Sequence, residues 1–133
     1  MSTPRLNGIL ETSLYVDDVD RSVRFYQSLF GFEVIYSGAR LTALAVREHQ
    51  ILLLFKKRGS ADIPSIPHDG DGQLHVAFAI PAEDLAAWEA QLTANGVAVV
   101  QKTAWERGGH SLYFRDPDQH LIELATPGLW SNY

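Results

Sequence analysis

The chain has 133 residues, of which 46% are hydrophobic and 20% charged, a composition typical of a folded globular protein. Its formal net charge is −5 and its longest basic run is Lys56 to Arg58, which excludes the concentrated basic face that nucleic-acid binders use. It contains no cysteine, which excludes disulfides, thiolate metal sites and a catalytic thiol.

The N-terminus lacks the apolar run of a signal peptide, and the longest apolar stretches have only the length of a strand. We therefore expect a soluble, cytoplasmic protein without a membrane partner.

The first half of the chain predicts a strand, a helix and three further strands. The predicted ranges are 9–16 for the first strand, 19–30 for the helix, and 32–37, 40–46 and 50–55 for the other strands. Val19, Val23, Tyr26 and Phe30 recur at helical spacing, and Gly31 predicts the end of the helix. Residues 59–72 contain Pro, Gly and Asp without periodicity, which predicts a linker or lid loop.

The same order then repeats, and placing Glu11 over His75 keeps both predicted helices in step. The predicted ranges are a strand over 73–80, a helix that begins at 81–84 and ends at Asn95-Gly96, and strands over 97–102, 110–115 and 120–125. The sequence thus predicts one α+β domain, residues 1–133, made of module 7–58, linker 59–72, module 73–126 and a docked tail, 127–133. We expect two paired βαβββ modules, each helix covering its own sheet, whose curved mixed sheet surrounds a cleft.

Three ionisable residues share the strand face that the predicted cleft requires. Side chains alternate along a strand, so the large apolar sets lie under the helices and Glu11, His75 and Glu123 project from the opposite face. Burying such groups together is costly unless they bind a cation or each other. Two carboxylates and an imidazole suit Mn²⁺, Fe²⁺, Ni²⁺, Co²⁺ or Zn²⁺. In the first module, the position that corresponds to Glu123 is Leu53, which cannot bind a metal. We therefore expect three protein ligands rather than four.

Several motifs are similar to those of one known superfamily. They are Leu14 to Tyr26, Leu29 to Glu33, Leu74 to Phe78, and Tyr113 to Asp118 continuing to Leu121, Ile122, Glu123 and Leu124. In their order and spacing the chain resembles the vicinal-oxygen-chelate superfamily, which includes glyoxalase I, fosfomycin-resistance thiol transferases, extradiol dioxygenases and bleomycin-resistance proteins. The resemblance implies a paired βαβββ fold, a homodimer and one divalent metal ion in the cleft.

Carried over residue by residue, the resemblance makes His75 and Glu123 metal ligands and places Glu11 where the family normally has His or Gln. A carboxylate there favours harder, oxygen-preferring metals or indicates that the metal has been lost. Leu53 stands where glyoxalase I-like members have a Glu that also acts as the base, which argues against glyoxalase chemistry. Gln119 replaces the usual Gly of the last turn.

The resemblance and the strand faces together give a set of candidate functional residues. Tyr113 matches a substrate-contacting Tyr of fosfomycin-resistance-like members, and we expect it to act with Glu123 in catalysis. The candidate substrate-binding residues are Ser13, Tyr15, Lys102, Arg107 and Tyr113. We expect His110 and His120, at turns or strand ends, to be solvent-exposed.

Two functions follow from the same residues. The first is a metal-dependent enzyme, of lyase, thiol-transferase or dioxygenase type, whose small-molecule substrate chelates the metal through adjacent oxygens. The alternative is a metal-free binding protein, similar to the bleomycin-resistance members, in which Glu11 and Glu123 attract a cationic ligand. The residues leave open the substrate, the metal, and whether one chain or two build the cleft.

Overall fold

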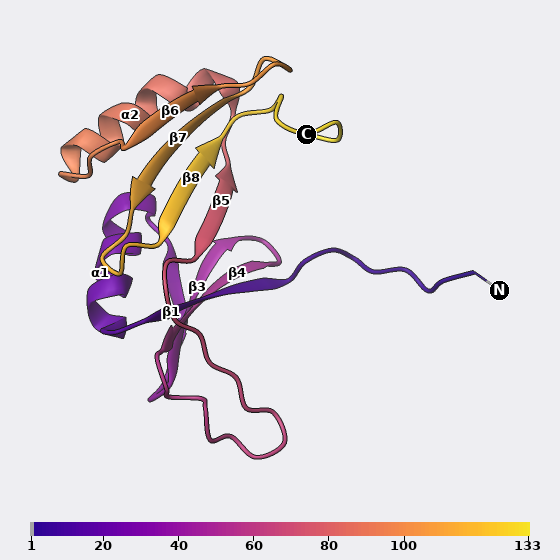
Figure 1. Cartoon of the computed structure of the whole chain (residues 1–133), viewed down its shortest axis with the longest axis vertical. Helices are drawn as coiled ribbons and strands as arrows, with labels where there is room; N and C mark the ends of the chain where they lie inside the picture. The colour runs from indigo at the N-terminus through magenta and orange to yellow at the C-terminus, as the bar shows by residue number, and fades with distance from the viewer. Residues whose placement is uncertain (1) are drawn as a thin grey trace. The chain divides into compact units, whose positions relative to one another are not determined.

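In the computed structural model, which describes residues 2–133, the backbone forms two four-stranded mixed sheets and two α-helices (Figure 1). The elements of the first half are β1 (Glu11–Val16), α1 (Val19–Phe30), β2 (Glu33–Ser37), β3 (Leu41–Arg47) and β4 (Gln50–Lys56). Those of the second half are β5 (His75–Ala79), η1 (Ala82–Asp84), α2 (Leu85–Ala94), β6 (Gln101–Ala104), β7 (His110–Arg115) and β8 (Leu121–Ala125).

Both sheets have the same topology, as the internal repeat predicts. The strand order is β1-β4-β3-β2 in the first sheet and β5-β8-β7-β6 in the second. In each sheet the first strand pairs in parallel with the fourth, and the other pairs are antiparallel. The predicted βαβββ repeat and the α+β class are therefore confirmed.

The alternation of side chains sets the buried face of each sheet. On β1, Leu14 and Val16 are fully buried, and on β8 Ile122 and Leu124 are as well. The other large buried side chains of the strands are Leu44, Leu52 and Leu54 in the first sheet and Leu112 and Phe114 in the second. The faces predicted for β1 and β8 are confirmed, which leaves Glu11 and Glu123 on the opposite faces.

The chain forms two compact units, and the C-terminal half of α1 belongs to the second. One unit contains the residues up to Val23 and residues 32–70, and the other contains residues 24–31 and 71–133. Phe30 packs on Phe78 of β5 and Trp88 of α2, with ring centroids 4.9 and 5.4 Å apart. The prediction that each helix covers its own sheet is therefore wrong for this half of α1, because its aromatic side chains find partners in the second sheet.

The predicted start of β6 is also wrong. The apolar run over 97–102 predicts a strand, but β6 begins at Gln101. Gly96 takes a φ of +69°, and the Val97 amide donates to the Leu92 carbonyl at 2.9 Å. The chain therefore uses residues 97–99 to return from the end of α2, and the Val100 amide already donates to the Tyr113 carbonyl of β7 at 2.8 Å.

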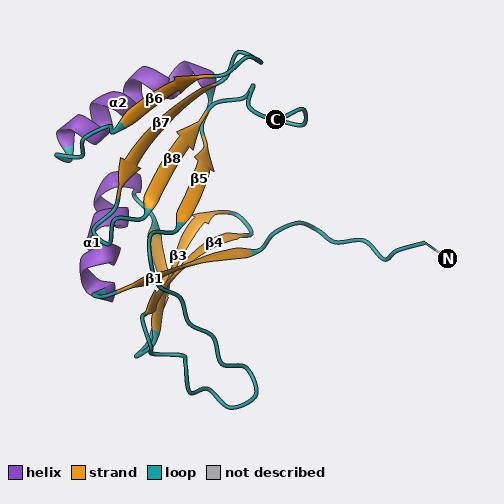
Figure 2. Cartoon of the chain, in the orientation of Figure 1, coloured by secondary structure: helices purple, strands orange, loops and turns teal. Residues whose placement is uncertain are grey.

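The loop and the tail both have defined positions within their units. Residues 57–74 contain neither helix nor strand (Figure 2). They include the whole predicted linker, 59–72, together with residues 73 and 74, for which the sequence predicts a strand. In the tail, the Tyr133 hydroxyl donates to the Ala125 carbonyl at 2.7 Å, so docking of residues 127–133 is observed. Within residues 2–133, we find no helix with the length and hydropathy required to cross a membrane.

A buried hydrogen bond attaches α1 to the turn between β7 and β8. The Tyr26 hydroxyl donates to Asp116 Oδ2 at 2.7 Å, and Asp116 Oδ1 accepts from the amides of Asp118 and His120 at 2.9 Å. Tyr26 and Asp116 are 0% and 2% exposed. Burial and then the charge of Asp116 raise the pKa of Tyr26 well above its ordinary value, so the phenol keeps the proton that it donates.

We expect Tyr26→Phe to lower the free energy of unfolding by about 1–3 kcal/mol, because it removes a donor from a buried carboxylate. Denaturant unfolding measures this change. The control is Tyr36→Phe, which alters a 57% exposed tyrosine. A loss of stability as large in the control as in Tyr26→Phe would contradict the role assigned to this hydrogen bond.

Candidate metal centre

His75 and Glu123 meet on the open face of the second sheet. Glu123 lies on β8, between β5 and β7, opposite Ala77 on one side and Tyr113 on the other. His75 lies two residues before Ala77 on β5, so both side chains share a face. His75 Nε2 is 3.2 Å from Glu123 Oε1. Strand alternation therefore places an imidazole and a carboxylate side by side, as the sequence predicted.

The orientation and tautomer of the His75 ring are fixed by the backbone. His75 Nδ1 is 2.8 Å from the Leu121 carbonyl oxygen. A carbonyl oxygen only accepts, so Nδ1 carries the proton and donates it. In the neutral ring Nε2 then has a free lone pair, the form in which histidine binds a metal ion.

The contact between His75 Nε2 and Glu123 Oε1 needs a positive charge, either a proton on the imidazole or a cation bound to both atoms. With neutral His75, Nε2 and Oε1 are two acceptors at 3.2 Å, an unfavourable contact. Protonation of Nε2 or a cation bound to both atoms makes it favourable. Glu123 is only 5% exposed, so its charge is poorly solvated by water. An imidazole nitrogen and a carboxylate oxygen are a donor set that fits first-row divalent metals.

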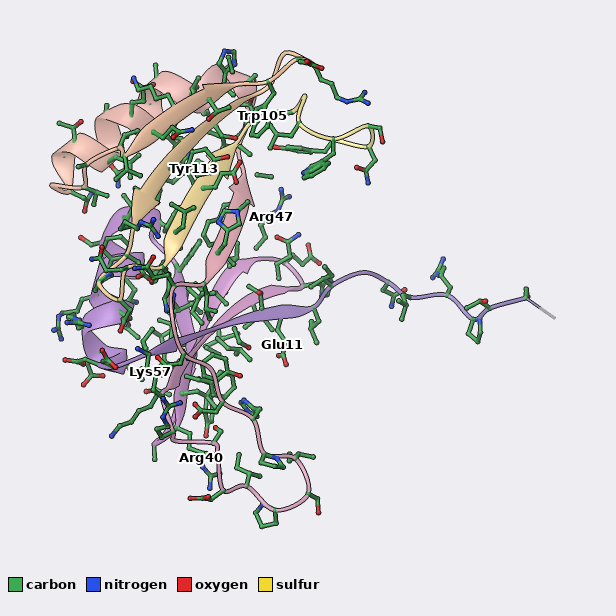
Figure 3. The ribbon with its side chains drawn as sticks, in the orientation of Figure 1. Glu11, Arg40, Arg47, Lys57, Trp105 and Tyr113 are labelled. Carbon is green, nitrogen blue, oxygen red and sulfur yellow. The ribbon has the colours of Figure 1, made fainter. Side chains whose placement is uncertain are left out.

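Ser111, Trp105 and Tyr113 surround the other side of Glu123. Ser111 Oγ donates to Glu123 Oε2 at 2.5 Å, and Trp105 Nε1 donates to Ser111 Oγ at 2.8 Å. Burial and then the charge of Glu123 raise the pKa of Tyr113, while a hydrogen bond with Ser111 opposes the rise. Tyr113 lies on β7 and Trp105 just beyond the end of β6 (Figure 3). The Tyr113 phenol thus stays protonated beside the carboxylate.

The other predicted ligand and two predicted substrate contacts lie in the first unit. Glu11 is exposed at the start of β1 (Figure 3), and Ser13 and Tyr15 follow on the same face. Within residues 2–133, no group of three or more His, Asp or Glu side chains gathers in an arrangement that could hold a metal ion. The participation of Glu11 therefore stays a prediction.

Tyr15 contacts the loop that follows β4. Its hydroxyl lies 2.7 Å from His68 Nδ1, and its ring stacks on Phe55 with centroids 5.6 Å apart. The His68 ring packs edge-on against Phe55 at 4.6 Å. Burial and then the charge of Asp69 raise the pKa of Tyr15. The loop therefore covers the end of this sheet face, where sequence predicted a lid or linker.

An ion pair closes the neck of this loop. The Arg58 amide donates to Asp69 Oδ1 at 3.0 Å, and Arg58 Nη1 donates to Asp69 Oδ2 at 2.5 Å. These hydrogen bonds lower the pKa of Asp69 to about 2. A surface loop whose ends are joined in this way is an Ω-loop.

The structure does not bring Lys102 to the candidate centre. On β6 it pairs with Leu112, whereas Gln101 pairs with Tyr113, so Lys102 lies on the helix-covered face. Its Nζ contacts Glu89 Oε2 at 3.1 Å. Arg107 is exposed in the hairpin between β6 and β7. These positions do not place either residue beside Glu123, and their substrate contacts stay predictions.

The position equivalent to Glu123 in the first sheet is apolar, as predicted. Leu53 pairs with Ser13, two residues after Glu11, just as Glu123 pairs with Ala77, two residues after His75. Leu53 is 9% exposed and packs with Ala43 and Phe55. The same position of the repeat is thus occupied by apolar Leu53 in the first sheet and by charged Glu123 in the second.

Sequence reasoning missed Ser111 and His68, and was wrong about His120. His120 is fully buried, because its Nδ1 accepts the Leu74 amide at 2.9 Å and its own amide donates to Asp116. A signal for Ser111 was available: it lies two residues before Tyr113 and therefore shares its face. Gln119 takes a φ of +66°, the left-handed conformation for which glycine is the usual residue.

Comparison with known proteins agrees with this geometry. Residues 8–124 match the model of the Glyoxalase/Bleomycin resistance protein/Dioxygenase superfamily. A metallothiol transferase, FosB, from Bacillus licheniformis is 30% identical over 127 residues, which cover 95% of this chain and 79% of that protein. The crystal structure of a lactoylglutathione lyase from Agrobacterium tumefaciens has a TM-score of 0.89 at 29% identity, covering 96% of this chain and 99% of that one.

A second similar structure contains a metal. It is a mutant of the fosfomycin resistance protein FosX from Listeria monocytogenes, complexed with Mn(II) and dihydroxypropylphosphonic acid, with a TM-score of 0.68 at 25% identity. It covers 90% of this chain and 90% of that chain. The predicted superfamily and fold are confirmed, and so, at the level of the superfamily, is the prediction of a metal-dependent enzyme.

The neck of the loop gives a prediction about pH. The pKa of Asp69 lies below its ordinary value of 3.8, so the ion pair is present above that pH and is lost as pH falls through about 2. We expect the Asp69 carboxyl ¹³C resonance to titrate near pH 2, and Arg58→Met to move the midpoint toward 3.8. NMR titration measures both values, with Arg47→Met as the control. Arg58→Met keeps the amide hydrogen bond, which lowers the pKa of Asp69 most, so a midpoint unaffected by this substitution would contradict the share assigned to the Arg58 side chain.

Proposed function

Because the chain belongs to the Glyoxalase/Bleomycin resistance protein/Dioxygenase superfamily, we propose that it is a metal-dependent enzyme of the thiol-transferase type. Its substrate is a small electrophile, such as an epoxide, with adjacent oxygens that chelate the metal. The observation that carries the proposal is the His75–Glu123 pair, with Nε2 directed at a buried carboxylate oxygen at 3.2 Å. The similarity to FosB supports the thiol-transferase type.

His75 Nε2 and Glu123 Oε1 would hold the metal ion in this proposal, with Glu11 as the third ligand. A divalent ion bound there supplies a Lewis acid that stabilises negative charge on a substrate oxygen. The Leu121 carbonyl accepts a hydrogen bond from His75 Nδ1–H, which leaves the lone pair on Nε2 and would make that nitrogen the metal ligand. Mn, Fe, Ni, Co and Zn all remain candidate metals.

Tyr113 has the role of a proton donor. Opening an epoxide with a thiol forms a carbon–sulfur bond, breaks a carbon–oxygen bond and leaves an alkoxide, which takes up a proton. The raised pKa keeps the proton on the Tyr113 hydroxyl, so it stabilises this alkoxide as a hydrogen-bond donor. The attacking thiol loses one proton, which replaces the proton that the alkoxide takes up. No bond formed or broken in this step requires an oxidant or a reductant.

Leu53 makes the glyoxalase reaction the less favoured alternative, despite the similarity to a lactoylglutathione lyase. The position that repeats Glu123 carries an isobutyl group packed against Phe55. Such a side chain neither ligates a metal nor removes a proton. We also expect a homodimer, as the family resemblance implies, and a cytoplasmic location, as the sequence predicts. Light scattering coupled to gel filtration measures the mass in solution.

The metal site predicts the result of a titration with Mn²⁺. We expect about one Mn²⁺ per chain by calorimetry, and a loss of affinity of at least about 100-fold in His75→Ala, Glu123→Ala and Glu11→Ala, because each removes a ligand. His110→Ala is the matched control, since His110 is exposed and lies on β7 out of phase with Tyr113.

Two results would contradict the proposal. The first is a wild-type protein that binds none of the five metals, which would favour the metal-free binding function. The second is metal binding without any thiol addition to epoxide substrates. In the expected case Tyr113→Phe lowers kcat about 10²–10⁴-fold with metal affinity unchanged, the range of general-acid effects.

A further inference from the structure

The two oxygens of the Glu123 carboxylate have different surroundings. Oε1 faces His75 Nε2 at 3.2 Å, whereas Oε2 accepts the Ser111 hydroxyl at 2.5 Å. Ser111 and Glu123 are 1% and 5% exposed, so water does not readily replace either partner. The carboxylate therefore presents one oxygen to the histidine and keeps the other for the serine.

Trp105 fixes the direction of the serine hydrogen bond. An indole N–H only donates, so Ser111 Oγ accepts from Trp105 Nε1 at 2.8 Å. Ser111 donates its single hydroxyl proton to Glu123 Oε2, and Tyr113 also forms hydrogen bonds with both of these residues. Trp105 itself is held where the hairpin between β6 and β7 closes, because its amide donates to the Gly109 carbonyl at 2.8 Å.

We propose that Trp105 and Ser111 are positioning residues that reserve Oε2, so that Glu123 binds the metal ion through Oε1 alone. A carboxylate can bind a metal through one oxygen or both, and a bidentate carboxylate occupies an additional coordination position. Holding Oε2 in a charge-assisted hydrogen bond leaves that position for a substrate oxygen or water. This inference rests on the proposed function. It explains why one coordination position of the metal ion would stay open for substrate or water.

The number of water molecules on bound Mn²⁺ tests the inference, because water-proton relaxation rises with that number. We expect Ser111→Ala to bind Mn²⁺ with one water fewer than the wild type, because Oε2 is released to the metal. The matched control is Ser60→Ala. Ser60 is also 1% exposed, and its hydroxyl has no hydrogen-bond partner among the described residues.

Two further variants separate positioning from a structural role. Ser111→Thr keeps a hydroxyl and is expected to restore the wild-type water number, whereas Trp105→Phe is expected to lower it. The control for Trp105→Phe is Trp130→Phe, which alters a 70% exposed indole. Thermal unfolding of the metal-free variants shows which of them are folded. If Ser111→Ala does not fold, Ser111→Thr and Trp105→Phe carry the test.

The outcomes distinguish this inference from the proposed function. A wild-type protein that binds no Mn²⁺ overturns both. A wild-type protein that binds Mn²⁺, with the same water number in Ser111→Ala and Trp105→Phe, overturns only the positioning role. A loss of one water in those variants, absent in Ser60→Ala and Trp130→Phe, supports it.

Discussion

The buried carboxylate of Glu123 is the constraint around which the second sheet is arranged. A charge that is 5% exposed destabilises the fold unless donors or cations surround it. Glu123 lies on β8, which has a neighbour on each side, so β5 supplies His75 and β7 supplies Ser111 and Tyr113. An edge strand has only one such neighbour. The topology thus explains why the ionisable group sits on this strand.

The first sheet shows what the same topology does without that carboxylate. Its equivalent position is Leu53, and the face there is a cluster with Ala43 and Phe55 against which Tyr15 packs. The Ω-loop then covers this end of the face through His68 and the Arg58–Asp69 neck. The two repeats therefore share their strand order but differ in the side chains on this face. At the equivalent position, Leu53 packs in an apolar cluster, whereas Glu123 contacts His75 and Ser111.

Alternation along strands let the sequence predict the fold and the shared face of His75 and Glu123, because period two is independent of the neighbours. It did not predict which donors complete the site, because alternation places Ser111 on the face of Tyr113 but does not show that its hydroxyl reaches Glu123. The burial of His120 depends on the Leu74 amide, a tertiary contact, and so escaped prediction. The packing of Phe30 on Phe78 was not predicted either, because an apolar stripe on a helix does not specify which sheet it packs against.

As the third ligand that we propose, Glu11 would set the charge of the proposed centre. With neutral His75, the carboxylates of Glu11 and Glu123 balance the two charges of a divalent ion, whereas the His or Gln usual in the family leaves one positive charge. A neutral centre attracts an anionic substrate less strongly than a positive one. The chain also places Lys102 in an ion pair with Glu89 on the helix-covered face, away from Tyr113. Under the proposed function, both features would favour a neutral or singly charged chelating substrate over a strongly anionic one.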